Sequence, residues 1–357
     1  MNKWYDDPKM DDDVIISSRV RLARNIKKYP FKRRQTEESA KSVIGDVVES
    51  LKRGGDKFYA QFKFIDMTGE GNGEKLALIN KHSISPEFAQ TKGPKALLLD
   101  NSEKLSIMIN EEDHLRMQAI YPGDNIDGAW DTVDKTDNLM EEYLDYAFDK
   151  DLGYLTSCPT NTGTGLRASY MIHIPLLEGT GEFRNIAATI GKFGMTVRGI
   201  YGEGTEPMGS IYQISNQVTI GKSEDEIISS LKSITARIIE SEHVLREKVT
   251  KQFNADIADR VYRAYGILSH SRKISLKEAI RLLSDVRFGF VSGILDVKKP
   301  KQNIYSIMMN IQNGILLYNS PSQSEDEADI KRADYIRKSF AKKQPKEREP
   351  DERKIDG

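Results

Sequence analysis

Two arginines in the segment SSRVRLARN, residues 17 to 25, are spaced for binding an anion. If the segment is a β-strand, its side chains alternate between two faces, and Ser17, Arg19 and Arg21 share one of them. Each guanidinium can donate two charge-assisted hydrogen bonds to phosphate oxygens, so the pair suits a polyphosphate. An edge strand whose arginines face solvent would have the same pattern, so this segment alone leaves both interpretations open.

Acidic residues follow an apolar run in INEEDHLRMQ, residues 109 to 118. Glu111, Glu112 and Asp113 belong to a loop or to the first turn of a helix, where the helix dipole favours carboxylates. If a helical turn follows, Glu112 and Arg116 share one face at i and i+4. The segment indicates either a binding site at the end of a strand or a capped helix with a surface ion pair that contributes about 0.3 to 0.5 kcal/mol.

A glycine-rich stretch, CPTNTGTGLRAS, spans residues 158 to 169. It matches G-x-G-x-x-A formally, but Pro159 disfavours a strand that runs straight into the glycine turn of a dinucleotide site. A phosphate loop of the Walker A type fails because Leu166 and Arg167 stand where Gly-Lys should follow the spacer. The remaining interpretation is a loop of small residues whose backbone can approach an anion, with Arg167 as an added cation.

The segment RGIYGEG, residues 198 to 204, adds Arg198 in a β-like stretch and Glu203 in a glycine-flanked turn. Such a turn can place a carboxylate into a cleft, although the segment alone fits any hairpin. With the segments above, the chain offers a set of arginines and carboxylates at strand ends or in glycine-rich turns: Arg19, Arg21, Arg116, Arg167, Arg198, Glu112 and Glu203.

The composition limits the class of protein. A length of 357 residues exceeds the size at which one hydrophobic core usually stops growing, so two domains are expected. The 53 basic and 54 acidic residues give a formal charge of −1, which excludes the broad positive field of a nonspecific nucleic-acid binder. Neither a membrane span nor a signal peptide is visible. We expect a cytoplasmic protein whose only cysteine, Cys158, is a buried or a reactive thiol.

The elements that must position these residues change in character near Gly221. Before it, a helical pattern covers 36–51, and β-forming runs cover 58–67, 75–80, 95–100 and 105–110; the last two predict a hairpin. A second hairpin is predicted around EGTEPMG. Adjacent strands of this kind favour an antiparallel sheet beside helices.

Helical patterns dominate after Gly221. Ser223 and Glu226 form a capping-box pattern before a helix that runs to about Val249, and Ser275 begins another. Isoleucines from Ile304 to Ile315 predict one more helical face. We expect a catalytic domain over 1–224, a helical domain over 225–340, and a disordered charged tail over 341–357.

The four segments, in this order over residues 14–220, resemble the ATP:guanidino phosphotransferases, the phosphagen kinase family. Within the family the chain is most similar to the bacterial protein-arginine kinase branch, the McsB type. The SSRVR segment begins at Ser17 without a preceding helical domain, a helical region follows the motifs, and Tyr201 stands within RGIYGE. The resemblance implies an α+β fold: an antiparallel sheet flanked by helices, of the phosphagen kinase and glutamine synthetase-like kind, followed by an all-helical C-terminal domain.

The resemblance also implies the roles of individual residues. Glu112 and Glu203 match the two carboxylates that hold the acceptor guanidinium, and Cys158 matches the active-site thiol of the family. The five arginines match those that hold the ATP phosphates. The wider set of residues expected at the ATP site is Ser17, Ser18, Arg19, Val20, Arg21, His82, Arg116, Arg167, Ala168, Ser169, Tyr170, Met171, Arg198, Gly199, Ile200, Tyr201, Gly202 and Glu203.

The implied activity is transfer of the γ-phosphoryl group of ATP to arginine side chains of proteins, which marks them for Clp-type proteolysis in a stress response. Mg²⁺ would be held mostly by ATP and water, because no dedicated carboxylate cage is visible. We hypothesise that Glu112 is the principal base and that Glu203 orients the acceptor. Met171 stands where phosphagen kinases commonly have a histidine near the adenine, with His173 two residues on.

The resemblance further implies partners: a zinc-binding activator protein, a Clp unfoldase, a heat-shock repressor as one substrate, and a second copy of the chain in a homodimer or higher oligomer. No nucleic acid and no membrane are expected. Family members carry an RDxxRA segment that binds phosphoarginine allosterically. Here ADIKRA, residues 328 to 333, keeps Asp329 and Arg332 but has Ala328 in place of the leading arginine.

Two other functions fit the same residues. One is a kinase of free arginine or another small guanidine. The other is a catalytically silent adaptor that binds phosphoarginine in the arginine-lined cleft. The second is disfavoured because both glutamates and all five arginines are present.

Overall fold

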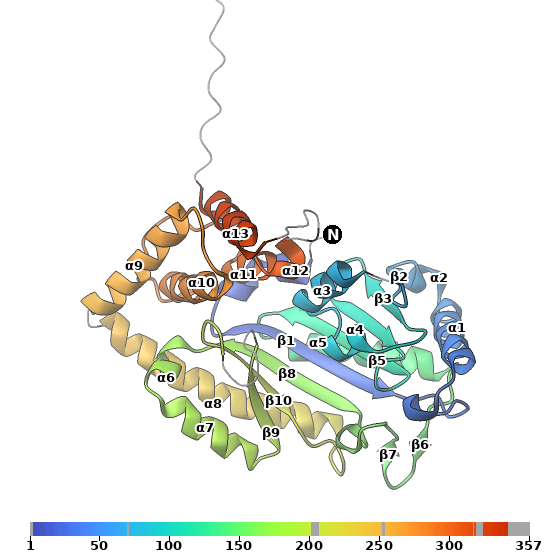
Figure 1. Ribbon diagram of the computed structural model, residues 1–357. Helices are drawn as coiled ribbons and strands as arrows, with labels where there is room; N and C mark the ends of the chain where they lie inside the picture. The colour runs from blue at the N-terminus through green and yellow to red at the C-terminus, as the bar shows by residue number, and fades with distance from the viewer. Residues whose placement is uncertain are drawn as a thin grey trace, which may run out of the picture.

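One antiparallel sheet forms the centre of the computed structural model, which describes residues 3–69, 71–200, 207–251, 254–316, 318 and 324–341 (Figure 1). Its strand order is β2-β3-β4-β5-β1-β8-β10-β9. The bounds are β1 (Ile15–Arg24), β2 (Phe62–Asp66), β3 (Ala96–Asp100), β4 (Leu105–Ile109), β5 (Leu115–Pro122), β8 (Leu166–His173), β9 (Met195–Gly199) and β10 (Ile211–Asn216). A separate hairpin joins β6 (Phe148–Asp149) to β7 (Gly153–Tyr154).

Helices surround this sheet and form the C-terminal region (Figure 1). Those up to the last strand are α1 (Glu37–Arg53), α2 (Asp56–Tyr59), α3 (Asn72–Asn80), α4 (Pro86–Gln90), α5 (Ile126–Glu141), α6 (Pro175–Gly179) and α7 (Glu182–Gly191). Those after it are α8 (Glu224–Lys251), α9 (Ala255–His270), α10 (Leu276–Val291), α11 (Ile304–Asn310), α12 (Asn313–Leu316) and α13 (Glu325–Phe340). Among the described residues, none of these helices has the length and apolar character needed to cross a membrane.

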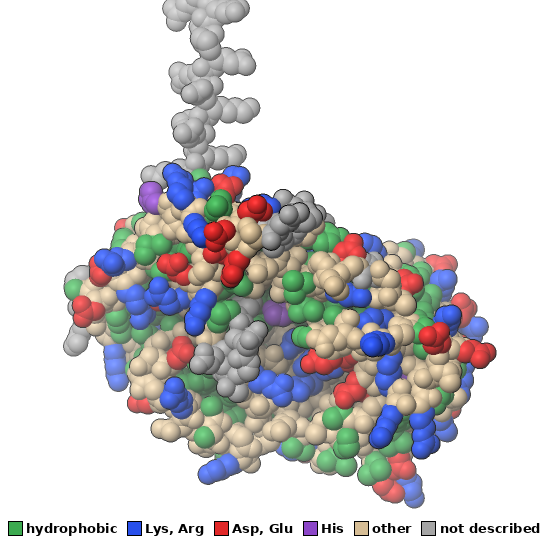
Figure 2. Space-filling view, viewed as in Figure 1, with side chains coloured by type: hydrophobic (Ala, Val, Ile, Leu, Met, Phe, Trp, Pro, Cys, Tyr) green, Lys and Arg blue, Asp and Glu red, His purple; other side chains and the backbone are tan. Residues whose placement is uncertain are grey.

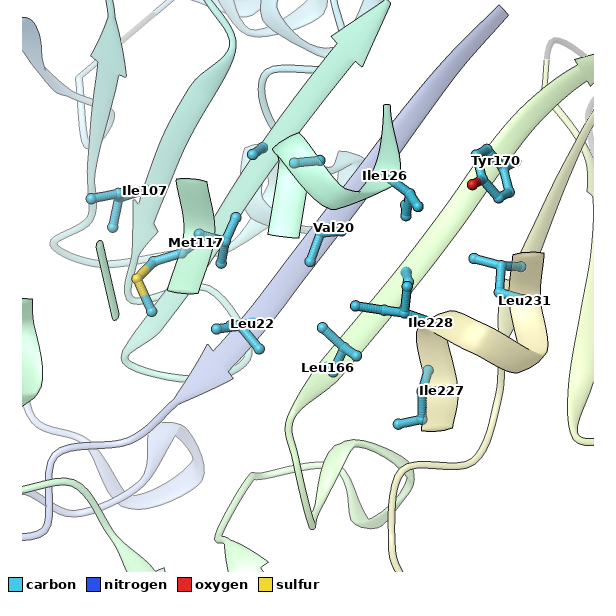
Figure 3. Close-up of a cluster of buried hydrophobic side chains, with 14 of the residues drawn as sticks. Val20, Leu22, Ile107, Met117, Ile126, Leu166, Tyr170, Ile227, Ile228 and Leu231 are labelled. Carbon is cyan, nitrogen blue, oxygen red and sulfur yellow. The ribbon is translucent and has the colours of Figure 1, made fainter. Parts of the chain in front are cut away.

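The first core lies between one face of the sheet and helices α1, α5 and α8. Val20 and Leu22 of β1 are fully buried there, because alternate residues of a strand point to the same face. Figure 3 shows them with the side chains that cover them, which come from β5, β8, α5 and α8: Met117, Leu166, Tyr170, Ile126, Ile227, Ile228 and Leu231. This apolar layer fixes which face the remaining side chains of β1 must take.

A second core joins the C-terminal helices to the beginning of the chain. Trp4 and Met10 are buried in the same cluster as residues of α9, α10, α11 and α13. Arg287 of α10, which is fully buried, reinforces this contact by donating to the carbonyl oxygens of Met10 and Asp13, both at 2.6 Å. The N-terminal segment is therefore held between the sheet and the helical region.

The structure confirms the predicted class: a large antiparallel sheet flanked by helices, with a helical C-terminal region. Both predicted hairpins are present, as β3–β4 and β9–β10. Ser223 and Glu226 form the capping box expected before α8. Because α8 packs against the sheet, it shares the first core, and the division of the chain at residue 224 stays a prediction. The tail over 342–357 lies outside the described residues.

Two local predictions are wrong, and one of two alternatives left open for the acidic segment is excluded. Residues 75–80 belong to helix α3 rather than to a strand. Leu76 is exposed there, so the apolar residues of this short run are not all buried as in a core strand. The isoleucines from Ile304 to Ile315 do not form one helical face: the first two lie in α11, Ile311 is its C-cap, and the last lies in α12. Residues after Asp113 form strand β5, so no helical turn follows the acidic segment.

Replacing Leu22 with Ala should lower the free energy of unfolding by about 2 to 5 kcal/mol, because it leaves a cavity in the apolar layer under β1. Urea unfolding of the two proteins would measure the loss. Lys41→Ala, an exposed change on α1, is the matched control and should stay within about 0.5 kcal/mol of the parent. A loss below 1 kcal/mol for the leucine variant would contradict this assignment of the core.

Candidate active site

The register of the central strands places five arginines on one face of the sheet. Residues paired directly across antiparallel strands share a face. Arg21 of β1 is opposite Gln118 of β5 and opposite Arg167 of β8. Arg116 is opposite Ala23, two positions along from Arg21.

The outer strands extend the same row. Arg198 of β9 is opposite Gln213 of β10, which is opposite Met171 and, through it, Ser17. In this register Ser17, Arg19 and Arg21 share a face, as the sequence predicts.

Four of these arginines line a cavity of about 290 Å³, and Arg116 lies in the same row outside its lining. Arg19, Arg21, Arg167 and Arg198 form its floor, and its wall comes from the end of α3, the connection that contains His82, and the start of α4 with Glu87. Figure 2 shows the Lys and Arg side chains gathered at the bottom of a hollow on this side of the molecule. A smaller hollow beside it is lined by Trp4, Ser17, Ser169 and Met171, among others.

The arginines are close enough to affect one another. Burial, and then the neighbouring arginines, lower the pKa of Arg19 and of Arg167 to about 10, and the same causes hold the pKa of Arg21 well below its usual value. Among the described residues none of these three lies within 4.0 Å of a carboxylate. A bound anion would relieve this concentration of positive charge.

Several guanidinium groups keep hydrogen-bonding capacity for a ligand. Arg19 donates to Gln213 Oε1 at 2.7 Å, and Arg167 donates to Ser215 Oγ at 3.1 Å. The buried Nε atoms of Arg21 and Arg167 have no hydrogen-bond partner in the described part of the chain. Buried donors are normally paired, so these atoms indicate an anionic ligand with several oxygens.

Arg116 differs because it already has a carboxylate partner. Its Nη1 lies 2.6 Å from Oε2 of Glu111, which is buried. Burial favours the neutral form of Arg116, but Glu111 outweighs it and raises the pKa of the arginine. The interpretation that paired Arg116 with Glu112 on a helical turn is wrong: Arg116 lies on β5, and the acidic residues form the β4–β5 loop.

Hydrogen bonds hold the β4–β5 loop on both sides of its tip. Asn110 adopts a positive φ of 66° and donates to the carbonyl oxygens of Ala40 at 2.9 Å and Pro94 at 3.1 Å. Asp113 accepts from Asn25 Nδ2 at 2.7 Å and from the backbone N–H of Ser157 at 2.6 Å. The last contact joins this loop to the residue that precedes Cys158.

Glu112 lies at that tip with its side chain exposed. Partial desolvation and the negative charge of Asp113 raise its pKa above the ordinary value for glutamate. A carboxylate of raised pKa near Arg116 of the arginine row is suited to accept a proton. Its expected partner Glu203, with Tyr201 and Gly202, lies outside the described residues.

The glycine-rich stretch contributes Arg167 to the cavity, and its glycines serve close packing. Gly165 has a φ of 66°, and a Cβ there would lie 2.6 Å from both the carbonyl oxygen of Ala23 and Nη1 of Arg24. Arg24 is buried, pairs with Asp137 at 2.6 Å, and donates to the carbonyl oxygen of Thr164 at 2.8 Å. Sequence reasoning missed Arg24: its spacing from Arg21 puts it on the opposite face of β1, and its partner Asp137 comes from a distant segment of the chain.

Cys158 is partly exposed at the start of this stretch. Its Sγ lies 3.0 Å from Oγ1 of Thr160, and its neighbour Ser157 is bound to Asp113. The thiol is therefore held near the loop that carries Glu112.

His82 lines the cavity and is fixed from both sides. Its φ is 58°, its carbonyl oxygen accepts from Gln118 Nε2 at 2.6 Å, and its Nε2 lies 3.0 Å from the hydroxyl of Tyr305 on α11. Burial and the charge of Arg19 lower the pKa of His82 to about 3, so the ring is neutral. His173 is elsewhere: it is fully buried and bound to Ser284 and Arg287.

Some residues expected at the ATP site point away from the cavity. Ser18, Val20, Ala168 and Tyr170 lie on the apolar face; Ser18 donates to the carbonyl oxygen of Gly123 at 2.8 Å. Ser17, Ser169 and Met171 face the smaller hollow, and Ile200 lines the larger one, whereas Gly199, at the end of β9, lines neither.

The residues of the ADIKRA segment lie on α13, away from the cavity. Arg332 is buried and forms an ion pair with Asp329. It also donates to the carbonyl oxygens of Ile274 at 2.9 Å and Ile311 at 3.2 Å and to Asn313 Oδ1 at 2.6 Å. The guanidinium of Arg332 therefore joins three parts of the helical region.

The comparisons with known proteins agree with this geometry. The model of the ATP:guanido phosphotransferase C-terminal catalytic domain matches residues 42–245, more than half of the chain. The chain belongs to the ATP:guanido phosphotransferase family. The resemblance drawn from the four motifs is thereby confirmed. A second family model, the C-terminal domain of protein-arginine kinase McsB, matches residues 254–351.

Relatives of this ATP:guanido phosphotransferase cover nearly its whole length. A protein-arginine kinase of Caldanaerobacter subterraneus is 46% identical over 326 residues, which are 91% of this chain and 96% of the relative. One of Halothermothrix orenii is 42% identical over 94% of this chain and 96% of the relative. The crystal structure of a lombricine kinase has a TM-score of 0.59 at 23% identity, covering 69% of this chain and 70% of the other, and supports the fold.

The stability of this phosphotransferase should fall as the pH is lowered from 7 to 5, and less steeply after His82→Gln. The pKa of His82 is about 3 in the folded protein and about 6.5 in the unfolded chain, so only the unfolded chain binds a proton there within this window. Between pH 7 and pH 5 the parent protein should lose about 1 to 2 kcal/mol more stability than the His82 variant, as measured by urea unfolding. His270→Gln, an exposed change, is the control; equal slopes for all three proteins would contradict a neutral His82.

Proposed function

We propose that this ATP:guanido phosphotransferase is a protein-arginine kinase that transfers the γ-phosphoryl group of ATP to arginine side chains of proteins. The observation that carries the proposal is the row of arginines on one face of the sheet, adjoining the loop that presents Glu112. The curated relatives that cover nearly the whole chain carry this name, which supports the choice of a protein acceptor.

The arginines bind the triphosphate and neutralise the charge that moves during transfer. Phosphoryl transfer requires alignment and electrostatic stabilisation more than covalent chemistry from the protein. Arg21 and Arg167, whose buried Nε atoms lack a partner in the described residues, offer donors to phosphate oxygens. Mg²⁺ accompanies ATP and adds charge neutralisation. The floor of the cavity is cationic and Glu111 is already bound to Arg116, so the phosphates and water would supply the ligands of the ion.

The acceptor guanidinium must lose a proton, because its pKa lies far above neutral pH and the protonated group has no free lone pair for attack. Glu112 accepts that proton while the nitrogen bonds to the γ-phosphorus and the bond to the oxygen of ADP breaks. The raised pKa of Glu112 brings its basicity closer to neutral pH. Glu203 orients the guanidinium, and the partly exposed Cys158 adjoins the acceptor.

The family resemblance extends this proposal to the cellular setting. The enzyme acts in the cytoplasm on proteins with exposed arginines, and phosphoarginine marks those proteins for a Clp unfoldase. A zinc-binding activator protein and a second copy of the chain are its further partners.

The purified protein should transfer label from radiolabelled ATP to casein, and the label should be lost in acid. A phosphoramidate hydrolyses in acid, whereas a phosphoserine does not, so acid treatment identifies the bond. Free arginine as acceptor is the comparison: stronger labelling of free arginine would favour a small-guanidine kinase. Acid-stable label, or no label with ATP bound, would contradict the proposal.

Glu112→Gln should reduce transfer to casein by at least about 10²-fold, because the variant has no base for the acceptor proton. Its affinity for ATP should remain within about twofold, since Glu112 lies outside the arginine row. Calorimetric titration with ATP separates the two effects. Glu38→Gln, an exposed change on α1, should leave both quantities unchanged. Equal losses of transfer and of ATP affinity would indicate that Glu112 belongs to the nucleotide site rather than to the acceptor site.

Arg167→Lys should lower kcat/KM for ATP by about 10²-fold or more, because a lysine cannot reproduce the planar fork of donors. Steady-state kinetics at saturating casein would measure the change. Arg33→Lys makes the same replacement at an exposed position outside the cavity and should have no effect. Full activity of the first variant would remove Arg167 from the phosphate site.

A further inference from the structure

Ser85, directly before helix α4 in the wall of the cavity, is linked through Glu111 to Arg116 of the arginine row. Its Oγ accepts from the backbone N–H of Phe88 at 3.0 Å, which makes Ser85 the N-cap of α4. The same hydroxyl donates to Oε1 of Glu111. No motif of the sequence pointed to this contact, since Ser85 and Glu111 come from segments 26 residues apart.

Glu111 connects Ser85 to Arg116. The carboxylate is buried, and its two oxygens have different partners: Oε1 accepts from Ser85, and Oε2 accepts from Arg116 Nη1 at 2.6 Å. A carboxylate held at one oxygen only could rotate about its side-chain bonds. Two partners fix its plane and therefore the direction of the guanidinium that it holds.

The helix that carries Ser85 is itself anchored. Lys95 is buried, and its Nζ donates to the last carbonyl oxygens of the α4 segment: Phe88 at 2.6 Å, Ala89 at 3.0 Å and Thr91 at 2.5 Å. Phe88 is fully buried in a small apolar cluster with Leu97 and Met108. These contacts prevent Ser85 from following Glu111 if the carboxylate moves.

We propose that Ser85 is a positioning residue: by holding Glu111, it directs the Arg116 guanidinium toward the nucleotide phosphates. This rests on the proposed function, in which the arginine row binds the triphosphate. Ser85 lines the cavity, and the role assigned to it is to hold Glu111 rather than to react with a substrate. Its loss leaves one buried oxygen of Glu111 without its donor, and the ion pair with Arg116 then adopts a different geometry.

The test compares the variants Ser85→Ala and Ser85→Thr. Ser85→Ala should raise both the Kd and the KM for ATP about tenfold or more, the size expected when a buried carboxylate loses a hydrogen bond. The KM for casein should not change, because the acceptor lies on the Glu112 side. Ser85→Thr keeps the hydroxyl and should restore ATP affinity to within about threefold of the parent.

A matched control separates this effect from the loss of a helix cap. Ser275 caps α10 in the same way, with its Oγ accepting from the backbone N–H of Glu278 at 3.3 Å, and it is remote from the cavity lining. Ser275→Ala should leave the Kd and KM for ATP unchanged. If Ser85→Ala does not fold, Ser85→Gly replaces it, since glycine is a tolerable N-cap without a hydroxyl.

The outcomes distinguish this inference from the proposed function. If the parent protein binds ATP and labels casein while Ser85→Ala binds ATP equally well, only the positioning role is overturned. A Ser85→Thr variant as defective as the alanine variant, or an equal defect in Ser275→Ala, also overturns it. If the parent protein neither binds ATP nor transfers phosphate, the proposed function fails first.

Discussion

One face of β1 must be buried against helices and the other must present arginines, and the rest of the structure depends on both. Its alternating side chains place Val20 and Leu22 against helices and leave Arg19 and Arg21 together on the other face. A shift of register by one residue would bury the arginines in the apolar core and expose the leucine. The large free energy of the apolar layer therefore fixes the register, and the register fixes the position of the cations.

Bringing these cations together is unfavourable without an anion. Burial and mutual repulsion oppose the charged forms of Arg19 and Arg167 and lower their pKa values. The strands tolerate this unfavourable energy because they are hydrogen-bonded to a neighbour on each side and their other face packs against helices. The same arrangement is preorganised for a polyphosphate, since few side-chain rearrangements are needed when the ligand enters. The arginine face therefore lowers the stability of the unliganded protein and favours binding of the anion.

The sequence was sufficient for the features that depend on local pattern. Period-two alternation in SSRVRLARN predicted the shared face, and Ser223 with Glu226 predicted the start of α8. The sequence failed where tertiary contacts decided the outcome. Residues 75–80 form a helix despite their β-like composition, and Arg116 pairs with Glu111 because the chain turns back into β5 rather than into a helix. The roles of Ser85, Lys95 and Arg24 rest on contacts between distant segments, which no spacing in the sequence reveals.

Glu111 and Glu112 show how neighbouring residues of one type acquire different chemistry. Glu111 is enclosed and contacts Arg116 and Ser85; burial alone would raise its pKa, but these partners hold the pKa below the usual value. Glu112 has no such donor in the described residues, and burial and Asp113 raise its pKa. One carboxylate is thereby kept ionised and fixed on a cation, while the other remains more basic and accessible. The separation follows from the β4–β5 turn, which directs one side chain inward and the next outward, so a single tight loop supplies both a support for the phosphate site and a base for the acceptor.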